Sequence, residues 1–133
     1  MSLGGAEPAE VDALGIAKAC RLAMTRAVEN LNVTPGHLLV DYVPLAEAGM
    51  AYTAVTGGDG RCHSIAAASI VAKVARDRMM VEANTAYPGY YFHRHKGYGT
   101  ARHMEMLQRL GPCRIHRRSF APVRLALEAI RGR

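Results

Sequence analysis

The sequence predicts an α/β fold in which several helices accompany short strands. Two short apolar segments, residues 37–41 (HLLVD) and 50–56 (MAYTAVT), have strand composition, and helical patterns precede and follow them. With 133 residues, half of them hydrophobic, one domain with its own core is the natural expectation. No apolar run reaches the ~18 residues of a membrane span, so we expect no membrane contact.

The first half of the chain supplies one expected helix and both strands. Apolar side chains keep roughly helical spacing over residues 11–31, and no Pro interrupts them. A turn at residues 34–36 leads into the first strand, whose unbroken apolar run is typical of burial on both faces. A connector at residues 44–49 separates it from the second strand.

The next elements are a flexible loop and a long helix. The glycine-rich residues 57–60 predict the loop. Ser64 can cap a helix that runs to about Ala83. A turn at residues 87–90 ends this region, and an irregular basic loop is expected after it.

Two further helices complete the prediction. Thr100 can cap a helix that stops at Gly111-Pro112, a usual carboxyl-terminal signal. Residues 117–130 favour a last helix with Pro122 near its start. We expect residues 10–133 to form the domain and residues 1–9 to be a disordered tail or a cloning remnant.

Two short strands are too few for a stable sheet on their own. The sheet should therefore expose an open edge unless a partner or a second copy of the chain covers it. A homo-oligomer formed through this edge is one expectation.

Charge is concentrated at the carboxyl end. Residues 94–133 carry ten Lys or Arg against two acids, which is +8, whereas residues 1–93 carry seven against nine, which is −2. A basic end on a near-neutral body is typical of a polyanion-binding surface. A solvated basic tail is the alternative, and charge alone leaves both open.

The three cysteines, Cys20, Cys62 and Cys113, are far apart and form no CxxC pair. Reduced thiols in a cytoplasmic protein fit them better than a disulfide framework or a zinc site. No secretory signal pattern opens the sequence.

Asp41 ends the first apolar strand. Ligands of open α/β sheets bind beyond the carboxyl ends of strands, so a carboxylate there is well placed for a metal ion. The alternative is a turn-forming Asp, because Val43-Pro44 follows closely.

Asp77 shares a helix face with Ile70 and Val74, and that face should be buried. A lone buried acid is costly unless it is paired or bound to a cation. Lys73, four residues earlier, offers a simple ion pair instead, so a metal ligand and a salt bridge both remain open.

Together, Asp41 and Asp77 supply half of a carboxylate cluster for a hard cation such as Mg²⁺. Two-metal cleavage of phosphodiesters needs ions ~4 Å apart. Glu47 and Asp59 lie in expected loops and could assist, although no spacing argument favours either.

The basic region contains Tyr98 between two glycines, where the backbone can approach a ligand. A Tyr can stack on a base or bind the 2′-hydroxyl that distinguishes RNA from DNA; the alternative is a ring packed under the loop. His95 and His116 are interpreted as structural or phosphate-facing. The accompanying polar and basic residues suit phosphate binding: Lys96, His103, Arg117, Arg118 and Ser119, with His95 as a further candidate.

These segments resemble ribonuclease HII. The resemblance rests on SIAAASIVAKVARD (residues 64–77), YPGYYFHRHKGYGTARH (87–103) and HRRSFAPV (116–123), with weaker likeness at residues 10–28 and 37–41. It implies a ribonuclease H-like fold, truncated to its carboxyl-terminal part, and an enzyme that cleaves the RNA strand of RNA–DNA hybrids or cuts at single ribonucleotides in DNA.

The same resemblance implies an Asp-Glu-Asp-Asp site for Mg²⁺ or Mn²⁺, with Asp41 as the third acid and Asp77 as the fourth. Tyr98 corresponds to the tyrosine that senses the ribonucleotide sugar. Nothing in the sequence matches the family's Asp-Glu-Ala-Gly-Arg-Gly strand, which bears the first two acids. Tyr42 stands where the family has Gly, and Gly57 where a Lys is common.

Three functions follow as alternatives. The chain is a hybrid-cleaving nuclease with impaired activity, a module that binds hybrid or duplex without cutting, or a degenerate remnant that persists as an oligomer.

Overall fold

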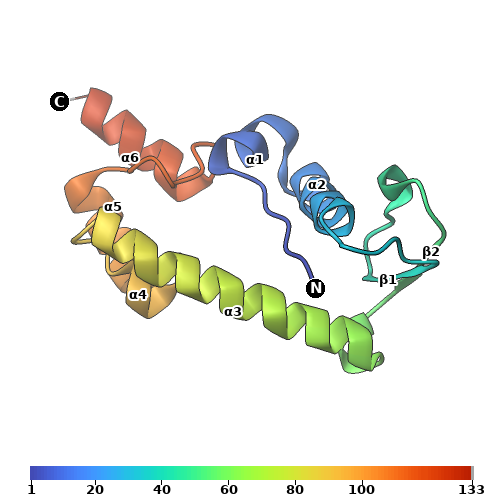
Figure 1. The fold of residues 1–133 in the computed structure, drawn as a ribbon. Coiled ribbons are helices and arrows are strands. Elements are labelled where there is room, and N and C mark those ends of the chain that lie inside the picture. Colours follow the sequence, from blue (N-terminus) through green and yellow to red (C-terminus); the bar gives the residue numbers. More distant parts are fainter. Residues whose placement is uncertain (133) are drawn as a thin grey trace. The chain divides into compact units, whose positions relative to one another are not determined.

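The computed structural model describes residues 1–132 and divides the chain into two compact units, residues 1–72 and 73–133. Mixed α/β structure is confirmed: the first unit holds a small sheet, and helices dominate the second (Figure 1). The expected extent of the domain, residues 10–133, stays a prediction, and its last residue lies outside the described part. No helix within residues 1–132 combines the length and apolar character needed to cross a bilayer.

The prediction of one helix over residues 11–31 is wrong in one respect, because two helices cover this region. These are α1 (Pro8–Leu14) and α2 (Ile16–Glu29), and Gly15 separates them with φ 78° and ψ 159°. The Gly15 amide still donates to the Val11 carbonyl, so this residue ends α1 and begins α2. Glycine is suited to this backbone conformation because it lacks a Cβ.

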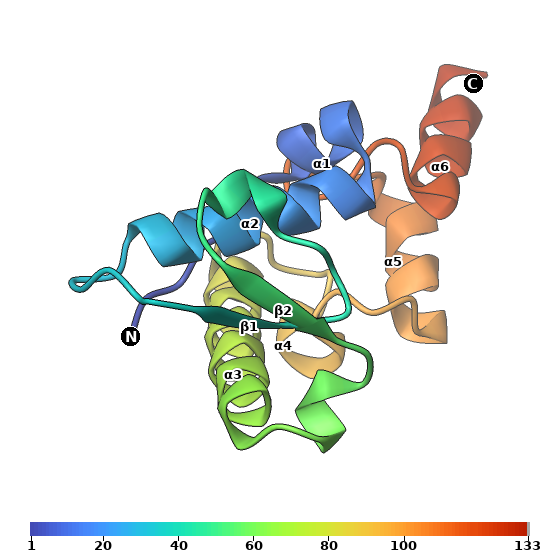
Figure 2. The same cartoon turned by 90° about the vertical axis from the view of Figure 1, so that its right-hand side faces the viewer.

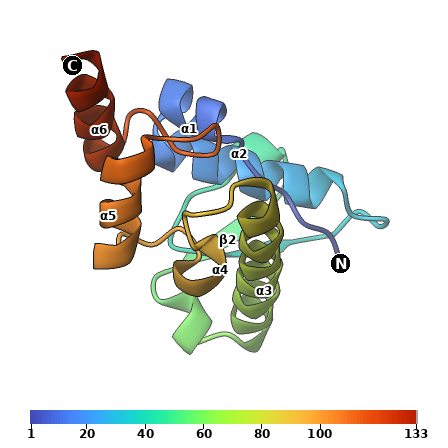
Figure 3. The same cartoon turned by 90° about the vertical axis from the view of Figure 1, so that its left-hand side faces the viewer.

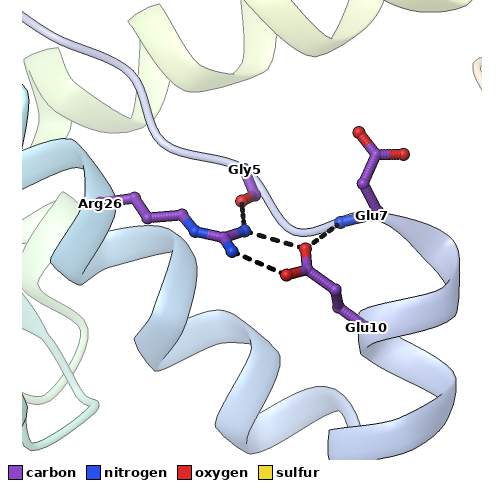
Figure 4. Close-up of polar contacts among 4 residues, drawn as sticks. All are labelled: Gly5, Glu7, Glu10 and Arg26. Atoms are coloured by element: carbon purple, nitrogen blue, oxygen red, sulfur yellow. Dashed lines mark hydrogen bonds and ion pairs between the residues drawn. The ribbon is translucent and has the colours of Figure 1, made fainter.

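A charged contact fastens α1 to α2. Arg26 donates two hydrogen bonds to the Glu10 carboxylate, at 2.8 and 2.7 Å, and one of 2.8 Å to the Gly5 carbonyl (Figure 4). Glu10 also accepts from the Glu7 amide at 2.8 Å. The segment that precedes α1, expected as part of a tail, therefore has defined contacts.

The sheet consists of β1 (Leu38–Asp41) and β2 (Tyr52–Val55), paired in parallel with Leu38 opposite Tyr52 and Asp41 opposite Val55 (Figure 2). Burial of the first strand on both faces, as predicted, is wrong: of its four residues only Val40 is fully buried. Within residues 1–132 no third strand joins this pair.

Short 3-10 helices follow each strand. The first, η1 (Ala46–Ala48), packs against α2 through an ion pair of 2.8 Å between Arg21 and Glu47. The second, η2 (Gly58–Gly60), forms where a flexible loop was predicted. Helix α3 (His63–Ala86) begins one residue before Ser64, so Ser64 lies in its first turn and the predicted cap there is wrong.

Residues 73–132 form the described part of the helical unit. The predicted turn at residues 87–90 is confirmed, and the basic segment after it contains the short helix α4 (Phe92–His95) rather than only irregular structure. Next come α5 (Ala101–Leu110), which the Thr100 side chain caps as predicted, and α6 (Ala121–Arg131). Figure 3 shows these last two helices meeting at an angle.

The helical unit is organised around two clusters of buried side chains. Tyr90 and Phe92 stack with ring centroids 5.2 Å apart, and Met106 completes the first cluster. Leu107 of α5 packs with Val123 and Ala126 of α6 in the second. These contacts fix α4, α5 and the connecting loops that carry the basic side chains.

Candidate metal and nucleic-acid site

Asp41 lies at the carboxyl end of β1, as predicted. Its Oδ1 atom accepts a hydrogen bond of 2.8 Å from the Gly58 amide. The residue is half-buried. Because the hydrogen bond engages Oδ1, Oδ2 is left as a carboxylate oxygen, the kind of ligand that hard cations prefer. The turn-forming alternative also has support, because the Val43 amide donates to the Asp41 carbonyl.

Tyr42 directly follows Asp41 and has φ 61°, a left-handed conformation. Its amide donates to the Val55 carbonyl at 3.0 Å, which continues the pairing with β2, and its side chain is exposed. The family's Gly at this position suits the same conformation.

The two additional acids named from the sequence are engaged in other contacts. Glu47 pairs with Arg21, and Asp59 accepts from the Gly60 amide at 2.9 Å. Their assistance to a metal stays a prediction.

Asp77 in α3 accepts a hydrogen bond of 2.7 Å from Lys73, so the ion pair considered from the sequence is present. This bond, with weaker contributions from Lys96 and Arg76, lowers the pKa of the Asp77 carboxyl. The carboxylate is therefore ionised at neutral pH, as metal binding requires.

The predicted burial of the Asp77 helix face is wrong. Ile70 is 64% exposed and Val74 is 44% exposed. Asp77 is therefore not a lone acid in apolar surroundings, because its negative charge is paired with the positive charge of Lys73.

A depression of about 390 Å³ adjoins Asp77 in the helical unit. Its lining residues are Lys96 and five residues of α3: Val74, Asp77, Arg78, Val81 and Glu82. Lys96 also donates to the His93 carbonyl and has φ 51°. Asp77 and Lys96 thus border the same depression.

Tyr98 is 55% exposed, so the alternative of a ring packed under the loop is wrong. The Arg76 guanidinium lies 4.8 Å from the Tyr98 ring centroid, an arrangement typical of cation–π contact. The Tyr98 amide donates to the His95 carbonyl at 2.8 Å. An anchored backbone with a projecting ring is suited to contact a ligand.

The histidines occupy a different place from the rest of the basic region. His95, His103 and His116 are all buried, and a role of His95 in substrate binding stays a prediction. Its Nε2 contacts the Tyr90 carbonyl at 2.8 Å, and its Nδ1 accepts from the Gly97 amide at 3.2 Å. The structural interpretation of His95 and His116 agrees with this burial.

The remaining predicted binding residues are close to the surface. Arg117 is half-buried, with its guanidinium 5.1 Å from the Phe120 ring centroid. Arg118 and Ser119 are exposed. They lie in the connection between α5 and α6.

Sequence reasoning missed two contributors. Gly58 binds the Asp41 carboxylate, and Arg76 covers Tyr98. His103 could have been assigned to the core from its spacing, since Met106 and Leu107 lie three and four residues later on the same face of α5.

The donor chemistry of Asp41 and Asp77 suits a hard divalent cation, but two carboxylates are only part of a ligand set. Within residues 1–132 no group of three or more His, Cys, Asp or Glu side chains is arranged to hold a metal ion. The two acids belong to different compact units.

Comparisons with known proteins agree on one family. The family model described as Ribonuclease HII matches residues 4–123. A ribonuclease HII of Dehalococcoides mccartyi (strain ATCC BAA-2266 / KCTC 15142 / 195) is 48% identical over 128 residues, covering 96% of this chain and 61% of that protein. One from Anaeromyxobacter sp. (strain Fw109-5) is 53% identical over 122 residues, covering 92% and 39%.

The fold has a counterpart among solved structures. The crystal structure of the ribonuclease H2 from Pyrococcus horikoshii OT3 matches with a TM-score of 0.71 and 22% identity, covering 96% of this chain and 68% of that one. The chain thus spans about 60% or less of the length of these two curated relatives.

Proposed function

The chain belongs to the ribonuclease HII family, and on this premise we propose that it serves the hydrolysis of RNA strands in RNA–DNA hybrids, or of DNA strands at embedded ribonucleotides. The observation that carries the proposal is the arrangement in the helical unit. Asp77 and Lys96 line one depression, and Arg76 connects α3 to Tyr98 of the adjoining loop.

Asp41 and Asp77 are the proposed metal-binding and catalytic residues of this chain. Asp41 offers the carboxylate that Gly58 orients, and Asp77 offers one kept ionised by Lys73. When bound, a divalent cation such as Mg²⁺ or Mn²⁺ supplies water activation and charge stabilisation for phosphodiester hydrolysis. Because the chain offers two of the four acids that the resemblance implies, we expect it to cleave slowly.

The basic residues are proposed to bind the nucleic acid. Lys96, Arg117 and Arg118 neutralise phosphates, and Ser119 adds a hydrogen-bonding hydroxyl. Tyr98 contacts the ribonucleotide sugar or stacks on a base. His95 contributes through the loop backbone that it supports.

A second function is binding of hybrid or duplex without cleavage. The observation that favours it is the lack of a three-ligand metal group within residues 1–132. Pairing of a second copy along the two-stranded sheet, and residence in the cytoplasm, stay predictions.

The test is a cleavage assay on duplex DNA with one embedded ribonucleotide, with Mg²⁺ or Mn²⁺ present. We expect slow cleavage that Asp41→Asn abolishes, while the control Glu29→Gln, which changes an exposed acid at the end of α2, retains it. Equal cleavage by Asp41→Asn and the parent chain would refute the role of Asp41. Salt-dependent binding without cleavage would favour the second function, and neither binding nor cleavage would favour the oligomeric remnant, which light scattering detects.

A further inference from the structure

Three buried histidine rings lie together behind the Tyr98 loop, defined here as residues 96–99. His95 and His103 stack with ring centroids 4.2 Å apart and an interplanar angle of 12°. His103 Nε2 lies 3.1 Å from His116 Nε2. All three rings are more than nine-tenths buried, and Phe92 packs its edge against two of them.

Backbone partners determine which nitrogen of each ring carries the proton. His116 Nδ1 accepts from the Cys113 amide at 3.0 Å, so its proton resides on Nε2 and points to His103. His103 Nε2 must then accept, which leaves the proton on Nδ1, where it donates to the Tyr98 carbonyl at 2.9 Å. The contacts therefore form one directed relay from the Cys113 amide through both imidazoles to Tyr98.

His95, the ring that stacks on His103, also contacts the Tyr98 loop. His95 Nδ1 accepts from the Gly97 amide, and so its Nε2 proton donates to the Tyr90 carbonyl. The Tyr98 carbonyl is held by His103 and the Tyr98 amide by the His95 carbonyl. The side chain of Tyr98 is exposed, but both its backbone carbonyl and its backbone amide are hydrogen-bonded to buried histidines: the carbonyl to the His103 ring and the amide to the His95 backbone.

We propose that His103 and His116 are positioning residues that hold the Tyr98 loop in its ligand-reading conformation through this neutral relay, and that adding a proton to the pair releases the loop. The role assigned to Tyr98 rests on the proposed function. The relay itself rests only on the contacts described above.

An added proton has no acceptor in this arrangement. On His103 it would place two N–H groups against each other, and on His116 it would oppose the Cys113 amide. The other groups facing the pair are His95 from α4, the Cys113 thiol 3.1 Å from His116 Nδ1, and the Tyr90 ring. Burial lowers the pKa of both His103 and His116, which agrees with a pair that is neutral at pH 7.

The first test needs no substitution. Long-range ¹H–¹⁵N NMR of the imidazoles in the parent chain at pH 7 distinguishes the tautomers. We expect the Nδ1–H form for His103 and the Nε2–H form for His95 and His116. An Nε2–H His103, or a positively charged ring in the pair, would overturn the relay.

The second test separates positioning from simple packing. His103→Leu removes the donor to Tyr98, His103→Asn retains a side-chain N–H near the same position, and His63→Gln replaces an exposed histidine as a control. We expect amide hydrogen exchange at Tyr98 to be about tenfold faster in His103→Leu, because loss of the hydrogen bond to the Tyr98 carbonyl favours opening of the loop, and opening exposes the Tyr98 amide. His103→Asn should recover much of the protection, and His63→Gln should match the parent chain. Equal exchange in His103→Leu and the parent would refute the proposal.

Binding distinguishes failure of the relay from failure of the proposed function. The ratio of affinities for a single-ribonucleotide duplex and an all-DNA duplex should fall in His103→Leu and return in His103→Asn. If the parent chain shows no such preference, the role of Tyr98 is wrong, while exchange and tautomers still decide the relay. If the preference exists and His103→Leu retains it, the relay does not position Tyr98.

Discussion

The Gly58 amide donates a hydrogen bond of 2.8 Å to Oδ1 of Asp41, which connects the start of η2 to the end of β1. Gly58 is buried, and a Cβ there would lie 2.6 Å from Ile65 Cδ1 and 3.3 Å from Asp41 Oδ1. The position of the carboxylate therefore depends on a residue without a side chain.

Gly58→Ala should destabilise the first unit and displace Asp41. Because Ile65 is buried, its end atom has little room to move away, and we expect a loss of about 1–2 kcal/mol in the free energy of unfolding. Urea denaturation measures this loss. Gly60→Ala is the matched control, since an added Cβ there meets nothing within 4 Å. Equal stability of both variants would show that the site tolerates the methyl group.

Tyr42→Gly should stabilise the chain by about 1 kcal/mol, because a left-handed backbone is unfavourable for residues with a Cβ. Tyr42→Ala is the control: it removes the same exposed ring but keeps the Cβ, so it should not stabilise. Thermal or urea unfolding compares the three chains. A gain for Ala equal to that for Gly would assign the effect to the ring instead.

The sequence predicted the elements with strong local signals. Thr100 at the start of α5, the turn at residues 87–90 and the strand ending in Asp41 are each specified by residues close to one another, and the structure has them. The break at Gly15 was not predicted, because apolar spacing continues through it and a single Gly is tolerated in many helices.

The site was predicted as a set of residues but only partly as an arrangement. The ion pair of Asp77 with Lys73 and the exposure of Tyr98 were each one of two alternatives that the sequence left open, and the structure has both. The burial of His95 and the relay through His103 depend on contacts between α4, α5 and the loop before α6, which no local pattern specifies. The sequence left a structural and a phosphate-facing role open for His95 and His116.

Acid should destabilise the helical unit through His116. Burial lowers its pKa to about 4 from an ordinary value of 6.5, so between these values the unfolded chain binds more protons than the folded one. The free energy of unfolding should be unaffected by this group above pH 6.5 and should fall, by up to about 3 kcal/mol, as the pH decreases to about 4. Urea denaturation across this range measures the slope.

His116→Gln should flatten that slope, because glutamine does not titrate. His63→Gln is the control, because it replaces a histidine whose side chain is exposed. A parent chain whose stability stays constant between pH 6.5 and 4 would contradict the assignment.

Glu10→Gln should lower the melting temperature above pH 5. Its hydrogen bond with Arg26 is the main cause of a Glu10 pKa lowered to about 2 from 4.5, so the ionised carboxylate favours the folded state (Figure 4). That contribution is present above pH 4.5 and is lost as the pH falls toward 2. Calorimetry at pH 6 and pH 3 should therefore show a larger difference between Glu10→Gln and the parent at pH 6.

Glu47→Gln is the comparison for this change, because Glu47 forms a single hydrogen bond with Arg21. Glu10 accepts two hydrogen bonds from Arg26, and a two-bond contact between Arg and a carboxylate is stronger than a one-bond contact. Glu47→Gln should therefore lower the melting temperature less than Glu10→Gln does. Equal effects would indicate that only surface charge matters at both positions.

Tyr98 offers two separable properties, a ring and a hydroxyl, and substitution can distinguish them. Arg76 lies 4.8 Å from the ring centroid, so Tyr98→Phe keeps the stacked surface while Tyr98→Ala removes it. If the hydroxyl reads the ribonucleotide sugar, Phe should keep total affinity for duplex but lose preference for a site with one ribonucleotide. Ala should lose that preference and also about 1–3 kcal/mol of binding, the usual value of one stacked base. Fluorescence anisotropy on matched duplexes measures both quantities, with Tyr52→Phe as the control. A Tyr98→Phe chain that still prefers the ribonucleotide would assign recognition to the ring, because that is then the only part the two side chains share.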